Sequence, residues 1–489
     1  MCDGRSSNIR LVGVCSRRFR RYERRGPSGG ETHNPKSGWP DPARGLKNLD
    51  FRSFLSALPG LKTFHKAVSK DLEVSRHLHD DPRQPMLFEN VDGHRLAGNV
   101  FPTRDHIASY LGLTKGQVRA ALVDAMEHPE EEKEVDAPAF MEVTDPKVDL
   151  RALPIPRYYP GDGGSYVTAN IILGSDGKYT NASFHRLMLL GEDTFAARIV
   201  PRHLYSIHQE AKRRGKDLPI AIALGCGPDF MLPAAMSVAY GESEVKIASR
   251  LSRKAFGAPF EVHRLPNGVI APASAEYVFE ARLTQTQTKE GPFVDITGTY
   301  DEVREQPVIQ VDRVYHRRNP IFQALLSGNL EHYMLMGMPK EPIIERAVRQ
   351  VVPKVHNVRL TEGGCCWLHG VVSITKQREG DGKNAILAAL AAHPSMKRVI
   401  IVDEDVDVED DREVEWAMAT RFQADRDEVV VSGARGSSLD PSLVDNLTAK
   451  QGFDCTKRIG EPAWKYERVK IKGGAAPNGE APPKDKTAM

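Results

Sequence analysis

The chain has 489 residues and a mass of 54.2 kDa, which is too long for one ordinary hydrophobic core and predicts two or three domains. Its 40% hydrophobic and 27% charged residues are typical of a soluble globular protein. A net charge of only +2 gives no indication that the chain as a whole binds nucleic acid or a membrane surface. No apolar run reaches the roughly 18 residues that a membrane-spanning helix needs.

Both ends of the chain are expected to lie outside the fold. Six arginines crowd into residues 17–25 and are followed by Gly, Pro, Ser and Asn, so residues 1–47 are predicted to be a disordered basic extension. An organelle address or a nucleic-acid-binding arm is the alternative. The tail, residues 471–489, is rich in Gly, Ala, Pro and Lys and is also predicted to be disordered. Six cysteines without CxxC spacing indicate reduced thiols, so we expect a cytoplasmic protein.

Local signals predict the first folded elements. Asp50 opens an amphipathic helix that Pro59 and Gly60 stop, and residues 86–91 form a strand that enters an Asp-Gly turn. Thr103 and Thr114 are helix caps. The charged residues 128–145 are expected to be a solvated linker.

A hairpin-like unit lies at the centre of the sequence. Two apolar segments, residues 187–190 and 195–200, are joined by a Gly-Glu-Asp turn, as in a pair of strands. Such a unit brings Asn181, which precedes it, close to His203, which follows it, with Arg186 nearby. An amide oxygen and an imidazole nitrogen are both metal ligands, and one carboxylate would complete a site for a divalent ion.

Glu244 is the candidate for that carboxylate. It follows a helix predicted at residues 204–214, an apolar strand at 218–224 and a glycine turn at 225–228 where backbone can approach a ligand. Glu244 lies in the first turn of the next helix, which runs to residue 256. A carboxylate is electrostatically favoured there, so a simple helix cap is the alternative reading.

Two further glutamates, Glu276 and Glu280, alternate with apolar residues and therefore point to one face of a strand. Two carboxylates on one face repel each other unless a cation lies between them. If Arg186 is that cation, one carboxylate stays ionised and the other can act as an acid with a raised pKa. Two solvated glutamates on an exposed strand face are the alternative. A turn at residues 290–293 and a strand at 294–300 follow.

The C-terminal part alternates helices and strands. A helix at residues 384–393, a strand at 399–402, a helix at 413–421 and a strand at 429–431 predict an α/β unit with parallel pairing. The acidic residues 403–407 at the end of the first strand are a candidate metal site, although carboxylates at a strand end more often cap a helix or face solvent.

Several motifs in a fixed order make the chain similar to the UbiD family of decarboxylases. The resemblance covers residues 48–470 and rests on NASFHR, IVPRH, GESE, SAEYVFE, EGPFVDITGTY, VDEDVDVEDDREVEWAMATRF and KQGFDCTKR. The segments LFENVDG, HYMLMGMP, TEGG, GDGKNAILAALAAHPS and SGARGSSLDPS resemble the group that includes the anhydromevalonate phosphate decarboxylases.

The resemblance implies a mixed α/β fold. An N-terminal cofactor domain with a β split-barrel core is expected at residues 48–325. A linking helix leads from it to a C-terminal α/β domain for dimerisation at residues 326–470. Assembly into a homodimer or a homohexamer is implied as well.

The resemblance also implies prenylated FMN, supplied by a partner flavin prenyltransferase. A manganese or magnesium ion would bind its phosphate, with potassium as a further cation. Asn181, His203 and Glu244 match the metal ligands. The implied cofactor-binding residues are Asn181, Ser183, Phe184, His185, Arg186, Arg202, His203, Glu244 and Lys450. Glu280, Arg186 and Glu276 match a Glu–Arg–Glu catalytic network, with Glu280 as the proton donor.

The implied activity is reversible, non-oxidative decarboxylation of an α,β-unsaturated or aromatic carboxylic acid, with anhydromevalonate phosphate as one candidate substrate. Ala182 and His185 depart from the ferulic acid decarboxylases, which argues against a cinnamate-type substrate. An aromatic or heteroaromatic acid is the alternative within the family. The alternatives outside it are a metal-dependent hydrolase, a non-enzymatic flavin- or metal-binding protein, and nucleic-acid binding through the Arg-rich N-terminus.

Overall fold

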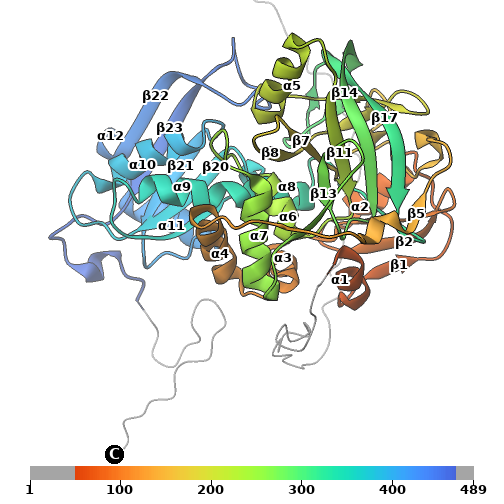
Figure 1. The fold of residues 1–489 in the computed structure, drawn as a ribbon. Coiled ribbons are helices and arrows are strands. Elements are labelled where there is room, and N and C mark those ends of the chain that lie inside the picture. Colours follow the sequence, from red (N-terminus) through yellow and green to blue (C-terminus); the bar gives the residue numbers. More distant parts are fainter. Residues whose placement is uncertain (1–49, 470–489) are drawn as a thin grey trace, which may run out of the picture. The chain divides into compact units, whose positions relative to one another are not determined.

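The computed structural model describes residues 50–469 (Figure 1). Helix α1 (Phe51–Ala57) begins where the sequence predicts, because the Asp50 carboxylate accepts a hydrogen bond from the Ser53 amide at 2.7 Å. Strand β2 (Met86–Val91) enters the predicted turn, in which both central residues have positive φ. The predictions for residues 1–47 and 471–489 lie outside the described residues.

A four-stranded sheet contains the first strands and one much later strand. Its order is β1 (Lys62–Phe64), β2, β3 (His94–Gly98) and β18 (Ile321–Gln323). The helices of this part are α2 (Glu73–Asp80), α3 (Arg104–Tyr110) and α4 (Lys115–Glu127). Thr114 caps α4 through a capping box, as predicted.

The predicted solvated linker is more firmly attached than expected. Its strand β4 (Lys133–Glu134) pairs with β12 (Glu261–Arg264), which β13 (Ile270–Pro272) extends. Glu130 also accepts hydrogen bonds from Arg250 and Arg253. The high charge of this segment therefore did not mean that it lacks contacts with the rest of the fold.

Nine strands form a sheet curled into a half barrel, which confirms the predicted mixed α/β fold with a split-barrel core. In sheet order these are β6 (Tyr166–Val167), β9 (Leu187–Leu189), β10 (Thr194–Ala197), β17 (Arg304–His316), β14 (Tyr277–Glu290), β11 (Leu218–Leu224), β7 (Ile171–Ser175) and β8 (Thr180–Phe184), with β5 (Val143–Thr144) on β17. Side chains alternate along β14: Tyr277 and Phe279 enter one hydrophobic core, whereas Val278 enters another.

Three helices accompany this sheet: α5 (His203–Arg213), α6 (Pro228–Ala234) and α7 (Glu244–Phe256). The glycine turn between β11 and α6 packs closely against protein side chains. A Cβ on Gly225 would lie 2.5 Å from the Cβ of Glu276, and one on Gly227 would lie 2.0 Å from the Tyr110 hydroxyl.

The strand predicted at residues 294–300 is wrong. The segment is a hairpin in which β15 (Phe293–Val294) pairs with β16 (Tyr300–Asp301). The Gly298 amide, at a φ of +75°, donates to the Asp295 carbonyl at 2.9 Å and closes the turn. This hairpin holds residues of the site described below.

The C-terminal part is built on a five-stranded sheet. Its order is β19 (Val355–Leu360), β20 (His369–Ile374), β21 (Arg398–Asp403), β23 (Leu447–Cys455) and β22 (Glu428–Arg435). Parallel pairing is present, but it joins β20, β21 and β23. The strand predicted at residues 429–431 lies in β22, which pairs antiparallel with β23 at one edge, and β19 is the antiparallel strand at the other edge. The helices are α8 (Leu330–Gly337), α9 (Glu341–Val348), α10 (Asp381–Ala392), α11 (Asp411–Arg421) and α12 (Ala424–Asp427).

The acidic residues at the end of β21 pair with cations. Asp403 and Asp405 both bind the buried Arg421, and Asp405 also binds Lys457 at 2.7 Å. Between residues 50 and 469 no cluster of three His, Cys, Asp or Glu side chains could hold a metal, and no helix is long and apolar enough to cross a membrane.

A buried carboxyl in α8 predicts a pH-dependent stability. Burial raises the pKa of Glu331 to about 7, although its carboxylate accepts the Phe101 amide at 2.8 Å. The folded state therefore holds the proton more tightly than the unfolded state. The stabilising effect is full below the ordinary pKa of 4.5 and is lost as the pH rises towards 7. In Glu331→Gln we expect the fall in unfolding free energy between pH 5 and pH 8 to be smaller by about 2 kcal/mol, measured by chemical denaturation. An equal fall in both proteins would contradict this.

Candidate active site

The three predicted metal ligands converge beside the edge strand of the curled sheet. Asn181 lies on β8, His203 begins α5 and Glu244 begins α7. The Asn181 Nδ2 donates to Glu244 Oε1 at 3.0 Å, and His203 Nδ1 lies 3.7 Å from the same oxygen. An amide, an imidazole and a carboxylate are a suitable donor set for a manganese or magnesium ion.

The Glu244 carboxylate does not cap its own helix. It is 2% exposed and points to β8, where its second oxygen accepts the Ala182 amide at 3.0 Å. This hydrogen bond fixes the carboxylate so that Oε1 faces Asn181 and His203. The geometry therefore favours the ligand role over the helix-cap alternative.

Ser183 and His185 support Asn181. Burial lowers the pKa of His185 to about 4, so its ring is neutral near pH 7. Its Nδ1 donates to the Arg198 carbonyl at 3.0 Å, which makes Nε2 an acceptor for the Ser183 hydroxyl at 2.9 Å. The same hydroxyl lies 3.1 Å from Asn181 Oδ1. The Ser183 hydroxyl has a single hydrogen. When it donates this hydrogen in a bond to His185 Nε2, Asn181 Oδ1 stays free to bind a metal.

The other predicted cofactor-binding residues have mixed positions. Arg202 precedes His203 and donates from Nη1 to the Ser237 hydroxyl at 2.6 Å, and the half-buried Phe184 ends β8. For Lys450 the cofactor-binding role stays a prediction. Its Nζ donates to the carbonyls of Pro394 and Met396 at 2.5 and 2.7 Å, because β23 carries it into the C-terminal sheet.

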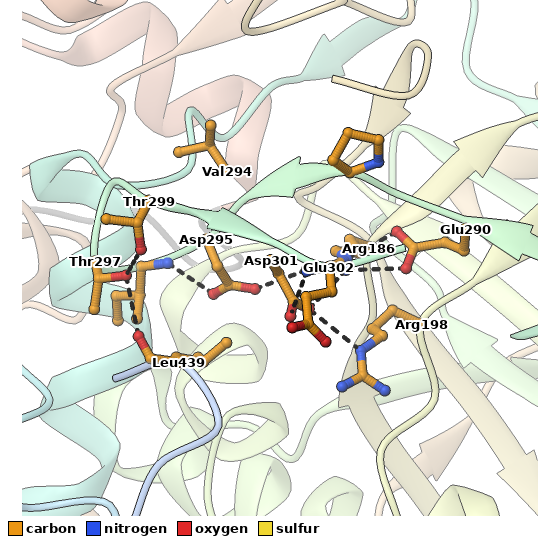
Figure 2. Close-up of polar contacts among 12 residues, drawn as sticks. Arg186, Arg198, Glu290, Val294, Asp295, Thr297, Thr299, Asp301, Glu302 and Leu439 are labelled. Carbon is orange, nitrogen blue, oxygen red and sulfur yellow. Dashed lines mark hydrogen bonds and ion pairs between the residues drawn. The ribbon is translucent and has the colours of Figure 1, made fainter. Parts of the chain in front are cut away.

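Arg186 is the centre of a second cluster, which Figure 2 shows. It binds Glu290 through Nε and Nη2, both at 2.9 Å, in a bidentate pair. Nη1 donates to Asp295 at 2.9 Å, and Nη2 also donates to Asp301 at 3.0 Å. The ring of Phe293 lies 4.8 Å from the guanidinium carbon.

The three carboxylates differ in how accessible they are. The side chains of Glu290 and Asp301 are 0% and 5% exposed, whereas that of Asp295 is 18% exposed. Burial by itself would raise the pKa of Asp301, but Arg186, Arg304 and Arg198 together bring it below its ordinary value. Asp295 is therefore the carboxylate of this cluster that a substrate can reach most easily.

The expected position of Arg186 between Glu276 and Glu280 is wrong. Glu276 is fully buried, but it binds Arg52 at the N-terminus and accepts the Ile321 amide at 3.0 Å. Glu280 accepts the Tyr315 hydroxyl at 2.9 Å and lies 3.6 Å from Arg313. Neither is a solvated glutamate, because both carboxylates are buried, and each has a partner other than Arg186.

Glu276 is expected to be structural. Glu276→Gln leaves Arg52 and Arg317 without their shared carboxylate, so the unfolding free energy should fall by about 3 kcal/mol. Turnover per folded molecule should change little. Denaturation with urea and an activity assay check the two expectations, with the exposed Glu305→Gln as the control. A stable but inactive variant would return Glu276 to the catalytic group.

Sequence reasoning missed Glu290, Asp295 and Asp301. The signal was present, because Glu290 opens the turn predicted at residues 290–293 and Asp295 follows that turn closely. The next turn is that of a hairpin, whose strands β15 and β16 bring Asp301 opposite Phe293. The prediction of a single strand over residues 294–300 concealed this.

The C-terminal part contacts the hairpin directly. The Thr297 hydroxyl donates to the Leu439 carbonyl at 3.2 Å, and Figure 2 shows this bond beside the Arg186 cluster. Leu439 lies in the loop between β22 and β23. The loop therefore lies next to the candidate site.

Three family models match the chain in succession. The 3-octaprenyl-4-hydroxybenzoate carboxy-lyase N-terminal domain matches residues 53–126, the Rift-related domain matches 131–330 and the C-terminal domain matches 333–455. The anhydromevalonate phosphate decarboxylase of Methanothermobacter thermautotrophicus is 43% identical over 82% of this chain and 95% of its own length. That of Aeropyrum pernix is 40% identical over 88% and 97%.

Relatives that act on other substrates, and solved structures, indicate the same family. The gallate decarboxylase of Lactiplantibacillus plantarum is 32% identical over 73% of this chain and 78% of its own length. The structure of the UbiD-class enzyme HmfF from Pelotomaculum thermopropionicum in complex with FMN superposes with a TM-score of 0.82 and 35% identity, over 86% of this chain and 97% of that one. A dimeric evolved form in complex with prFMN has a TM-score of 0.80 and 32% identity, over 87% and 97%. With its curled sheet and three matched domains, the chain belongs to the UbiD family of decarboxylases.

Proposed function

We propose that this decarboxylase acts on a phosphorylated α,β-unsaturated acid of the anhydromevalonate phosphate type, with prenylated FMN as its cofactor. The observation that carries the proposal is that one short segment supplies both Asn181, of the Asn181–His203–Glu244 site, and Arg186, the centre of the carboxylate-rich cluster. Relatives at 40–43% identity with that substrate support the substrate class.

The metal site would hold the cofactor through its phosphate. A manganese or magnesium ion on Asn181, His203 and Glu244 would neutralise that phosphate, and Ser183 and His185 would keep the Asn181 oxygen oriented. Potassium is a further cation within the proposal. When bound, the modified flavin supplies the electron sink that carbanion formation requires and that no side chain offers.

The Arg186 cluster would supply the proton. Loss of CO₂ from a carboxylate leaves an electron pair on carbon, which takes a proton from a protonated Asp295. Arg186 positions Asp295, and the bidentate Glu290 fixes Arg186. Solvent then returns the proton to Asp295. We assign the donor role to Asp295 and not to Glu280, because Arg186 contacts only the former of the two.

Assembly and location are also proposed. Leu387 is 50% exposed on α10, and a solved relative is a dimer, which supports a homodimer or a homohexamer. A flavin prenyltransferase would supply the cofactor, and we place the enzyme in the cytoplasm. Light scattering of the purified protein measures the assembly.

The test of the function uses protein co-expressed with a flavin prenyltransferase and purified without oxygen. We expect prenylated FMN by mass spectrometry, about one divalent ion per chain, and CO₂ release from anhydromevalonate phosphate. Gallate and 3,4-dihydroxybenzoic acid serve as competing substrates, because relatives decarboxylate such acids. Turnover of these acids alone would replace the proposed substrate class, and loaded protein without turnover of any acid would refute the proposal.

A further inference from the structure

A buried lysine lies near the candidate metal site without a carboxylate partner among residues 50–469. Lys340, in the short 3₁₀-helix Met338–Lys340, is 5% exposed. Its Nζ donates to the Ala235 carbonyl and to the Ser237 hydroxyl, both at 2.7 Å. An ammonium group has three N–H donors, so these two bonds leave the third unused; Nζ also lies over the Trp367 ring, 5.7 Å from its centroid.

An arginine adds to this positive charge. Arg202 donates to the same Ser237 hydroxyl at 2.6 Å and is itself exposed to solvent. Like Lys340, Arg202 forms no ion pair within the described part of the chain. Two cations that donate to one hydroxyl repel each other, which is a cost that an anion bound between them would offset.

Glu244 does not provide that anion. It is near enough to raise the pKa of Lys340, which burial and Arg202 lower to about 7. Its two oxygens are already engaged by Asn181, His203 and the Ala182 amide. A divalent ion together with Glu244 would neutralise a flavin phosphate to within one charge, so Lys340 and Arg202 remain available for a second anion.

We propose that Lys340 and Arg202 form a subsite for the phosphate monoester of the substrate. The inference rests on the proposed function and extends it by naming the residues that would select a phosphorylated acid. An arginine fork binds phosphate oxygens in pairs, and a lysine adds a compact charge. Arg202 precedes helix α5 and Lys340 comes from the C-terminal part, so the subsite joins both.

The first test compares substrates with and without the phosphate. In Lys340→Met we expect the KM for the phosphorylated acid to rise about 10-fold or more, while the KM for its unphosphorylated alcohol stays constant. Lys340→Arg should recover most of the loss. Lys354→Met, at an exposed position, is the matched control. If Lys340→Met does not fold, phosphate binding by the exposed Arg202→Gln, described below, decides. An equal rise for both acids would overturn the proposal.

A second test separates the two sources of phosphate. Retention of FMN and of riboflavin, which lacks the phosphate, is measured for each variant by fluorescence. Unchanged discrimination between them assigns the subsite to the substrate. A specific loss of FMN would assign it to the cofactor and overturn the substrate role.

A third test does not depend on turnover. Calorimetric titration of the flavin-loaded protein with inorganic phosphate should show weaker binding in Arg202→Gln than in the wild type. If the wild type decarboxylates no phosphorylated acid but this difference is seen, the anion site stands and the proposed function fails. If wild type and variant bind phosphate equally, the subsite is refuted whether or not the enzyme turns over.

Discussion

Asp295→Asn should reduce kcat by at least about 100-fold, because the variant cannot deliver a proton to the carbon that has lost CO₂. Asparagine is close in size to aspartate and can still accept the Arg186 donor, so the hairpin should remain folded. Metal and flavin contents should be those of the wild type. The measurement is steady-state turnover of cofactor-loaded protein, with Glu305→Gln as the control at an exposed position.

A comparison with Glu280→Gln shows whether Asp295 or Glu280 is the proton donor. Glu280 is held by Tyr315 at 2.9 Å and is not in the Arg186 cluster, so its variant should retain most turnover. Glu290→Gln should lower kcat as well, because half of the bidentate pair that fixes Arg186 is lost. A variant series in which Glu280→Gln is inactive and Asp295→Asn is active would restore the assignment made from the sequence.

The second large effect is expected at the metal site. Asn181→Ala and Glu244→Gln each remove or weaken one ligand, so metal affinity should fall by at least about 10-fold and flavin should be lost with the metal. Elemental analysis and the flavin absorption spectrum measure both losses. Asn384→Ala, on the exposed side of α10, is the control.

Chelation provides an independent check of the same site. Removing the metal from the wild type should release flavin, and adding manganese with flavin should restore binding. In Glu244→Gln the restoration should require more manganese. If flavin remains bound after complete loss of the metal, flavin binding does not depend on the metal and the proposed anchoring role is refuted.

Local sequence patterns predicted several helices and strands of the fold. Strand β11 (Leu218–Leu224) and helix α7 (Glu244–Phe256) have the bounds that the sequence predicts, because apolar runs, caps and glycines act over a few neighbouring residues. The metal site was predicted for a related reason. A tight hairpin lies between Asn181 and His203, and short connections limit how far apart the two can be.

The partners of Arg186 could not be predicted in this way. Glu290 is 104 positions away, and β14 is 14 residues long. Its pairing with β17 shifts register after Glu280 and again after Leu283. Each shift changes which residues of β17 face the later residues of β14, so simple alternation cannot identify the carboxylate that reaches a given cation.

The sequence by itself identified the family and several of the elements, and it suggested the three candidate metal ligands, since these depend on local patterns and motif order. Only the tertiary structure decided which acids surround Arg186, that Lys450 binds carbonyls, and that Lys340 lies beside Arg202. The physical reason is that a charge selects its partner by distance and burial in three dimensions. Residues far apart along the chain acquire these only when the sheets and helices pack.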